Sequence, residues 1–165
     1  MNSAREWESR LGHKAFKSNR THDFFVGVID YGWIAREGFG KDRWFEGRPE
    51  ILGGVFGGAQ YRPDHAYIVG AAPLLRYNFT GLQRRVPFIQ GGGGVAATDI
   101  GRPDLGSTFE SNVQGGVGVR YLLTQDVGLT LEYRYIHFSN AGIRQPNVGV
   151  NANVLLMGVS WFSDS

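Results

Sequence analysis

The sequence contains no cysteine, no long apolar run and little net charge, and each absence excludes a class of protein. Without cysteine, the chain has neither a disulfide framework nor a thiolate metal site. Its four histidines show no His-x-x-x-His spacing, so we expect no zinc site and no other metal or cofactor. A net charge of +2 spread along 165 residues argues against a nucleic-acid partner. No stretch of about 18 apolar residues is present that could form a transmembrane helix.

The start of the chain is polar and lacks the apolar core of a secretory signal peptide. If the chain is a membrane barrel, this start indicates a mature form, an incomplete reading frame or an engineered start. The sequence does not decide among the three. We divide the chain into a polar N-terminal segment, residues 1–20, which contains at most a weak first strand, and a barrel domain, residues 21–165.

Glycine and aromatic residues are abundant, with 25 glycines and 13% aromatics. This composition, without collagen-like periodicity, is typical of a small twisted barrel rather than a helical protein. Extended segments alternate with Gly/Pro/Asp-rich turns. Most segments run about 11–15 residues, longer than strands of soluble sheets and long enough for a tilted strand to cross a bilayer. The expected strands are 24–34, 49–61, 66–79, 87–98, 109–123, 127–139 and 150–162.

The two faces of these strands differ in chemistry, because successive side chains of a strand point to opposite sides. In 127–139, apolar and tyrosine side chains alternate with polar and charged ones. Charged groups and glycines on one face suit a packed polar lumen inside a lipid-facing wall. A soluble barrel or sandwich alternates equally well and stays the alternative. We expect the following residues to form a network in the lumen: Glu110, Arg120, Glu132 and Arg134.

The strand count needs one more element, because bacterial single-chain barrels have an even number of strands. It should lie in residues 5–20, where Trp7, Leu11 and Phe16 give a weak pattern. The alternative is a short piece at residues 43–46. We therefore predict an all-β fold, a small antiparallel up-and-down transmembrane β-barrel of eight strands, seven of which are clear in the sequence.

A candidate site for chemistry lies where segment 127–139 ends. His137 and Ser139 share one face of that strand, roughly 6.5–7 Å apart at Cα, and an imidazole at this spacing can activate a serine hydroxyl. Asn151 opens the same outer face of the next strand. If both termini are periplasmic, connection 140–149 is extracellular and the three side chains meet at the outer leaflet. The alternative is ordinary turn chemistry with an interfacial histidine.

The string His137-Phe-Ser139-Asn140-Ala-Gly142, followed by Gln-Pro-Asn and Gly149, resembles the lipid A 3-O-deacylase (PagL-type, or acyloxyacyl hydrolase) family of outer-membrane esterases. The similarity covers roughly residues 48–162. It implies an eight-stranded bacterial outer-membrane barrel that hydrolyses the ester at the 3-position of lipid A. Lipopolysaccharide and other outer-membrane lipids would be its partners, and a homodimer stays open. By this resemblance Ser139 is the nucleophile, His137 the general base, and Asn140 and Gly142 build the oxyanion hole.

One residue departs from the family pattern. Members of known activity carry a glutamate twelve residues after the serine, where this chain has Asn151. An amide oxygen can accept a bond from the imidazole, but it cannot stabilise the imidazolium with a full charge. In a serine protease the same change costs about 10⁴ in kcat, mostly through the wrong tautomer. Three alternatives follow: a working Ser-His-Asn site, rescue by another carboxylate, or a catalytically silent barrel with a structural or lipid-binding role. Glu132 is a poor rescuer because its parity points it into the lumen.

Overall fold

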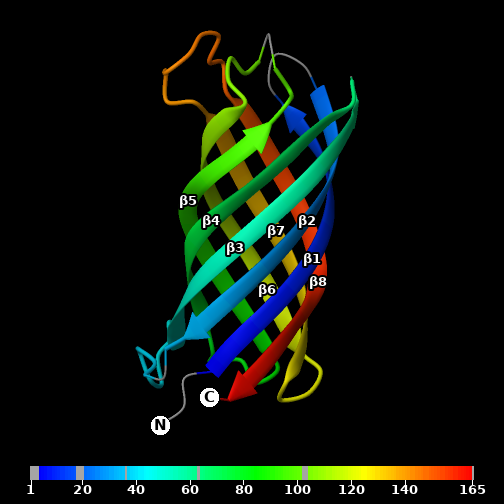
Figure 1. Cartoon of the computed structure of the whole chain (residues 1–165). Coiled ribbons are helices and arrows are strands. Elements are labelled where there is room, and N and C mark those ends of the chain that lie inside the picture. The colour runs from blue at the N-terminus through cyan, green and yellow to red at the C-terminus, as the bar shows by residue number, and fades with distance from the viewer. Residues whose placement is uncertain (1–3, 18–20, 36, 63, 102–103, 165) are drawn as a thin grey trace.

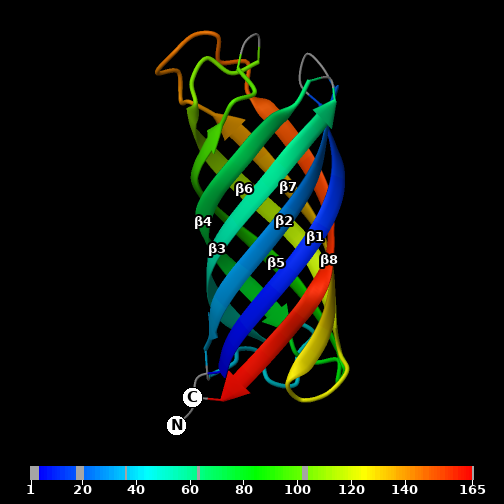
Figure 2. The same ribbon diagram turned by 45° about the vertical axis from the view of Figure 1, so that its right-hand side comes forward.

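The structure is a closed antiparallel barrel in which each strand pairs with its neighbours in sequence and the last pairs with the first (Figures 1 and 2). It is a computed structural model that describes residues 4–17, 21–35, 37–62, 64–101 and 104–164. These residues contain no helix, and so none long and apolar enough to cross a membrane. The eight strands are β1 Ala4–Lys17, β2 Thr21–Ile34, β3 Gly47–Arg62, β4 Ala66–Phe79, β5 Arg85–Thr98, β6 Phe109–Leu122, β7 Val127–Ser139 and β8 Val150–Asp164.

The all-β, up-and-down, eight-stranded prediction is therefore confirmed. The strand sought within residues 5–20 is β1, which pairs with β2 on one side and β8 on the other. The alternative at residues 43–46 is wrong, because these residues lie in turns of the β2–β3 connection. The pattern of β1 is weak because its buried face carries Glu6, Glu8 and Arg10 instead of apolar side chains.

The outer wall of the barrel is apolar. Exposed apolar side chains project from every strand, and aromatic residues lie near both ends: Trp33 and Trp161 at the end that carries the termini, Tyr67 and Phe109 at the other. Such a wall is the signature of a barrel in contact with lipid, and it excludes the soluble alternative. Its middle includes Leu11, Ile29, Val55, Val69, Leu75, Ile89, Val113, Val117, Leu131, Leu155 and Met157.

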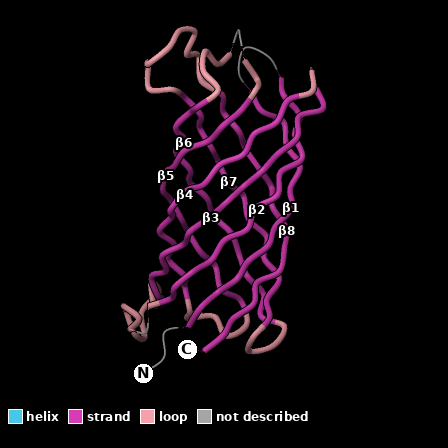
Figure 3. The backbone as a smooth tube through the Cα atoms, in the orientation of Figure 1, coloured by secondary structure: helices cyan, strands magenta, loops and turns pink. Residues whose placement is uncertain are grey.

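The lumen holds two layers. Near the end away from the termini it is apolar, a finding that corrects the expectation of a polar lumen throughout. Phe24, Phe56 and Phe138 belong to this cluster, with Val150 and Leu156 of β8. Small eight-stranded barrels have interiors just wide enough for side chains to fill. This apolar layer lies at the strand ends that carry the 140–149 connection. Figure 3 shows that connection at the end of the barrel away from the termini.

The second layer is a network of buried charges. Arg10 forms ion pairs with Asp30 and Glu132, and Arg76 pairs with Glu8 at 2.9 Å. Gln90 connects the two groups, since it accepts from Arg76 at 2.9 Å and donates to Glu132 at 2.9 Å.

Three of the four residues expected in the lumen join this network. Arg120 pairs with Glu6, and Arg134 pairs with Glu132 at 2.6 Å. The placement of Glu110 in the network is wrong: among the described residues it forms no ion pair. Although buried, it sits at the start of β6 opposite Ala96, beside the apolar layer and away from the arginines.

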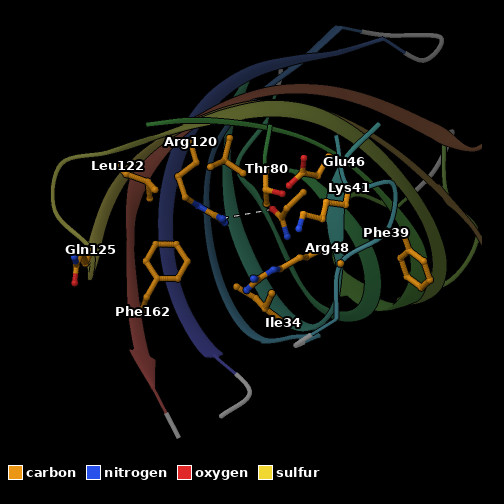
Figure 4. Close-up of a pocket in the computed structure, with 13 residues that line it drawn as sticks. Ile34, Phe39, Lys41, Glu46, Arg48, Thr80, Arg120, Leu122, Gln125 and Phe162 are labelled. Carbon is orange, nitrogen blue, oxygen red and sulfur yellow. Dashed lines mark hydrogen bonds between the residues drawn. The ribbon is translucent and has the colours of Figure 1, made fainter. Parts of the chain in front are cut away.

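The charged layer ends in a cavity at the terminus end of the barrel, with a volume of about 540 Å³ (Figure 4). Arg120 forms its inner wall and donates to Asn78 at 3.5 Å, while Lys41 and Arg48 border it from the β2–β3 connection and β3. The predicted site residues lie at the opposite end of the barrel, so this cavity takes no part in their geometry.

Candidate active site

The candidate site lies on the outer surface, where β7 ends and β8 begins. Burial alternates strictly along β7, so Tyr135, His137 and Ser139 face outward, as the sequence predicted. The sheet register places His137 directly opposite Asn151 of β8 and Ser139 opposite Ser111 of β6. The 140–149 connection, orange at the top of Figure 1, closes over this edge. The fold therefore brings the three expected residues together at one rim of the apolar wall.

The imidazole of His137 is held by Asn151. His137 Nδ1 lies 2.7 Å from Asn151 Oδ1. Because an amide oxygen only accepts, Nδ1 must carry the hydrogen, which leaves Nε2 free to take a proton. This is the tautomer that a general base beside a serine requires.

A second residue that sequence reasoning missed contacts the same oxygen. The hydroxyl of Tyr135 donates to Asn151 Oδ1 at 2.7 Å. Tyr135 shares the outward face two positions before His137, so strand parity was a sequence feature that could have identified it. Asn151 Oδ1 thus accepts two hydrogen bonds, one for each of its lone pairs.

Ser139 shares the outward face with His137, but within the described part of the chain no hydrogen bond joins their side chains. The carbonyl of Ser139 accepts from the Ser111 hydroxyl at 2.6 Å, which ties the end of β7 to β6. Catalytic hydrogen bonds are often long in ligand-free enzymes and tighten when substrate binds. Ser139 thus lies on the same face as His137, two positions further along β7, without a hydrogen bond between the two side chains.

The two residues expected to supply oxyanion donors are engaged within their own loop. Buried Asn140 accepts from the N–H of Gly142 at 3.0 Å and donates from its side chain to the carbonyl of Arg144 at 2.9 Å. Its backbone N–H donates to Asn147 Oδ1 at 3.1 Å. Ala141 and Gly142 both have positive φ, of 53° and 82°, so the chain turns sharply here. Asn140 therefore organises the loop that follows the serine.

The 140–149 loop packs against the β5–β6 connection and against His137 itself. Leu105 is buried and pairs with Asn147 through a β-bridge. On the other side, Gly149 has a φ of 78°, and a Cβ there would lie 2.9 Å from His137 Cε1 and 3.5 Å from Nε2. Gly149 thus lies beside the edge of the ring that carries the free nitrogen, where a larger residue would displace the imidazole.

Among the described residues, no carboxylate takes the position beside His137 in which the family resemblance implies a glutamate. Glu132 is buried in the lumen, where it pairs with Arg10 and Arg134, on the opposite face of β7 from His137. In the described ranges His137 has an amide partner, and no carboxylate is bonded to it. The same ranges contain no group of three or more potential metal ligands among histidine, cysteine, aspartate and glutamate.

The fold and the wall define a bacterial outer-membrane β-barrel, with serine, histidine and asparagine gathered at its outer rim. The model of the lipid A 3-O-deacylase (PagL) family matches residues 29–160, and the chain belongs to this family. It is 40% identical over 84 residues to lipid A deacylase PagL of Pseudomonas aeruginosa, covering 49% of this chain and 46% of that protein. With PagL of Bordetella bronchiseptica it shares 32% over 89 residues, or 54% and 47% of the two chains. The chain thus spans about half the length of the curated relatives it matches.

Solved structures bear out the fold. The crystal structure of the outer membrane enzyme PagL superposes with a TM-score of 0.69 at 24% identity, covering 93% of this chain and 97% of that one. Neisserial surface protein A superposes with a TM-score of 0.74 at 17% identity, covering 96% and 97%. Since a surface protein and an enzyme share this architecture, the barrel alone does not specify a reaction.

Proposed function

We propose that the chain is a lipid A deacylase, a serine esterase that hydrolyses the acyl ester at the 3-position of lipid A in the outer leaflet. The observation that carries the proposal is the 2.7 Å contact between His137 Nδ1 and Asn151 Oδ1, which leaves Nε2 free on the strand face that His137 shares with Ser139. Membership in the lipid A 3-O-deacylase (PagL) family supplies the substrate class.

In the proposed reaction His137 acts first as base and then as acid. Nε2 of His137 removes the proton of Ser139 as its Oγ attacks the ester carbonyl carbon. The tetrahedral intermediate collapses when the C–O bond to the sugar breaks, and His137 returns the proton to the leaving sugar oxygen. Water, activated by the same nitrogen, then cleaves the acyl-serine and releases the hydroxylated fatty acid. Asn151 keeps the imidazole in the competent tautomer throughout.

Asn140 and Gly142 are proposed as oxyanion donors, and their present bonds set a condition on that role. Their side-chain amide and backbone N–H already bond within the loop, so substrate binding must exchange these bonds for bonds to the oxyanion. One such donor is worth about 2.7–4 kcal/mol in a serine esterase-type mechanism.

The outward position of the site favours a substrate that stays in the membrane. Val113 lies next to His137 across the β6–β7 pair, and Leu155 and Met157 continue the outer face of β8; all three are exposed. An acyl chain held against this wall can present its ester to Ser139 while its apolar surface stays in lipid. Outer-membrane glycolipids therefore suit the site better than water-soluble esters.

A catalytically silent barrel is the second candidate. Asn151 favours it, because an amide provides no charge to stabilise the imidazolium that forms when Ser139 is deprotonated. Such a chain would keep the wall and the loops and would serve a structural or lipid-binding role.

Mass spectrometry of lipid A separates the two candidates. Cells would express this chain behind a functional export signal, beside a Ser139→Ala control whose barrel is shown to fold by heat-modifiable gel mobility. Loss of one hydroxyacyl mass with the wild-type residue alone supports the deacylase. Identical spectra from two folded barrels support the silent barrel.

A further inference from the structure

We propose that Tyr135 is a positioning residue that fixes the amide of Asn151 with its oxygen toward His137; this inference rests on the proposed function. The hydroxyl of Tyr135 and the Nδ1 of His137 lie at the same distance, 2.7 Å, from the same Oδ1 atom. Among the described residues no hydrogen bond joins Tyr135 to Ser139 or to the imidazole, so its route to the base is the amide.

An asparagine in the acid position has a problem that a glutamate lacks. Its amide has two different ends, and rotation by half a turn exchanges the accepting oxygen for the donating nitrogen. With nitrogen toward the ring, His137 Nδ1 must accept, so its hydrogen moves to Nε2. A protonated Nε2 cannot take the proton of Ser139. The orientation of one amide therefore decides whether the base is competent.

Tyr135 favours the amide orientation in which Asn151 turns its oxygen toward His137, because the phenol hydroxyl is a donor that needs an acceptor. While Asn151 presents its oxygen, the Tyr135 hydroxyl donates to it. If the amide turned, Tyr135 would have to accept from the nitrogen and its own proton would need another acceptor. A turned amide would therefore leave the Tyr135 proton without the acceptor that it has in this structure, and an unpaired donor at the lipid boundary is costly.

The same two strands contain a matched control. Two residues further from the 140–149 loop on each strand, a second Tyr–Asn pair repeats the first: the Tyr133 hydroxyl donates to Asn153 Oδ1 at 2.7 Å. Tyr133 and Tyr135 are on one face of β7, and Asn153 and Asn151 on one face of β8. In both pairs the tyrosine bonds the asparagine two positions before the residue directly opposite it. Of the two pairs, only Tyr135–Asn151 also bonds His137. Tyr133→Phe therefore removes a hydrogen bond of the same kind and length as Tyr135→Phe does, but one that does not involve the partner of His137.

Kinetics on lipid A in detergent micelles test the proposal first. Tyr135→Phe should lower kcat about tenfold, equivalent to about 1.4 kcal/mol, and leave KM unchanged, because the fraction of competent imidazole falls while substrate contacts persist. Tyr133→Phe should stay within about twofold of the wild type. Equal losses of kcat in the two variants would overturn the proposal, since they would indicate that either Tyr–Asn hydrogen bond affects activity through the outer wall in general.

Repeating Tyr135→Phe in an Asn151→Glu chain tests whether Tyr135 acts by orienting the amide. In an Asn151→Glu chain both ends of the group are oxygens, so no orientation can present a donor to His137. Tyr135→Phe in that background should therefore change kcat by no more than about twofold. The same tenfold loss in both backgrounds would mean that Tyr135 acts on structure and would overturn the proposal.

Histidine tautomers provide a readout that does not depend on activity. With ¹⁵N-labelled histidine, and a His137→Gln spectrum for assignment, the ring nitrogens can be observed well above the ordinary histidine pKa of about 6.5. We expect hydrogen on Nδ1 in the wild type and in Tyr133→Phe, and a mixture of tautomers in Tyr135→Phe. An unchanged tautomer in Tyr135→Phe would overturn the proposal. If no variant hydrolyses lipid A in a Ser139-dependent manner, the proposed function fails while this measurement still decides the role of Tyr135.

Discussion

At the scale of single residues, the site depends on which atoms face His137. Its Nδ1 edge meets the amide of Asn151, and its Nε2 edge lies beside Gly149. The first contact sets the tautomer, and the second leaves room for the ring. A substitution at Asn151 tests the first, and a substitution at Gly149 tests the second.

Asn151→Glu should raise the rate of lipid A deacylation by at least about tenfold. A carboxylate in this position would accept from His137 Nδ1 in either orientation and stabilise the imidazolium with a full charge. The gain should be smaller than the roughly 10⁴ in kcat that the acid-to-amide change costs in a serine protease, because that loss comes mostly from the wrong tautomer. Fatty-acid release from micellar lipid A measures the change, with Ser139→Ala as the blank. An unchanged or lower rate would place the orienting group elsewhere.

Gly149→Ala should lower the same rate about tenfold or more while the barrel still folds. The new Cβ would crowd His137 Cε1, and a side chain at positive φ adds roughly 1–2 kcal/mol of strain. Gly115→Ala is the control, because a Cβ there meets nothing within 4 Å on the same outer wall. If both variants keep wild-type rates, the glycine is not needed for the base.

At the scale of elements, the strands could be predicted better than the loops. Alternating polarity over long segments located seven strands and the outward face of His137, because a two-residue period follows directly from strand geometry. The pattern of β1 stayed weak because its inner face consists of charges, which are neutralised by partners on other strands, among them Asp30 of β2 and Arg76 of β4. The bonds of Asn140 with Gly142 and Arg144 depend on positive φ angles, which composition does not specify.

Substitutions at Asn140 distinguish its two candidate roles. Asn140→Asp keeps the oxygen that accepts from Gly142 but loses the donor to Arg144, whereas Asn140→Ala loses both. If the residue mainly organises the loop, Asn140→Asp should retain several-fold more activity than Asn140→Ala. If its side-chain amide donates to the oxyanion, both should fall by about 10²–10³. Rates on micellar lipid A, compared for barrels of equal heat-modifiability, give the answer.

At the scale of the whole molecule, a barrel with an apolar exterior holds a layer of paired charges in its interior. Arg10 is surrounded by Asp30 and Glu132, with Glu8 3.4 Å away. Ion pairs buried this deeply add little as pairs, but the loss of one partner leaves uncompensated charge. The sequence revealed the charges of the inner face, while their pairing needed the barrel closure that joins β1 to β8.

Arg10→Ala should destabilise the barrel by about 3–5 kcal/mol, because Asp30 and Glu132 would lose a shared cation. Urea unfolding in detergent, followed by gel mobility, measures the shift. Arg5→Ala is the control on the same strand; Arg5 is exposed, and its loss should change stability by no more than about 0.5 kcal/mol. Equal stability of the two variants would contradict a supporting role for the network.

The outward-facing site has a consequence for how the proposed reaction is measured. Because His137 and Ser139 face the leaflet, substrate reaches them by lateral diffusion, and the relevant concentration is the number of lipid A molecules per unit of surface. Addition of inert detergent at constant total lipid A should therefore slow the reaction in proportion to the falling surface fraction. Dilution of the whole sample with micelles of unchanged composition should leave the turnover per enzyme constant.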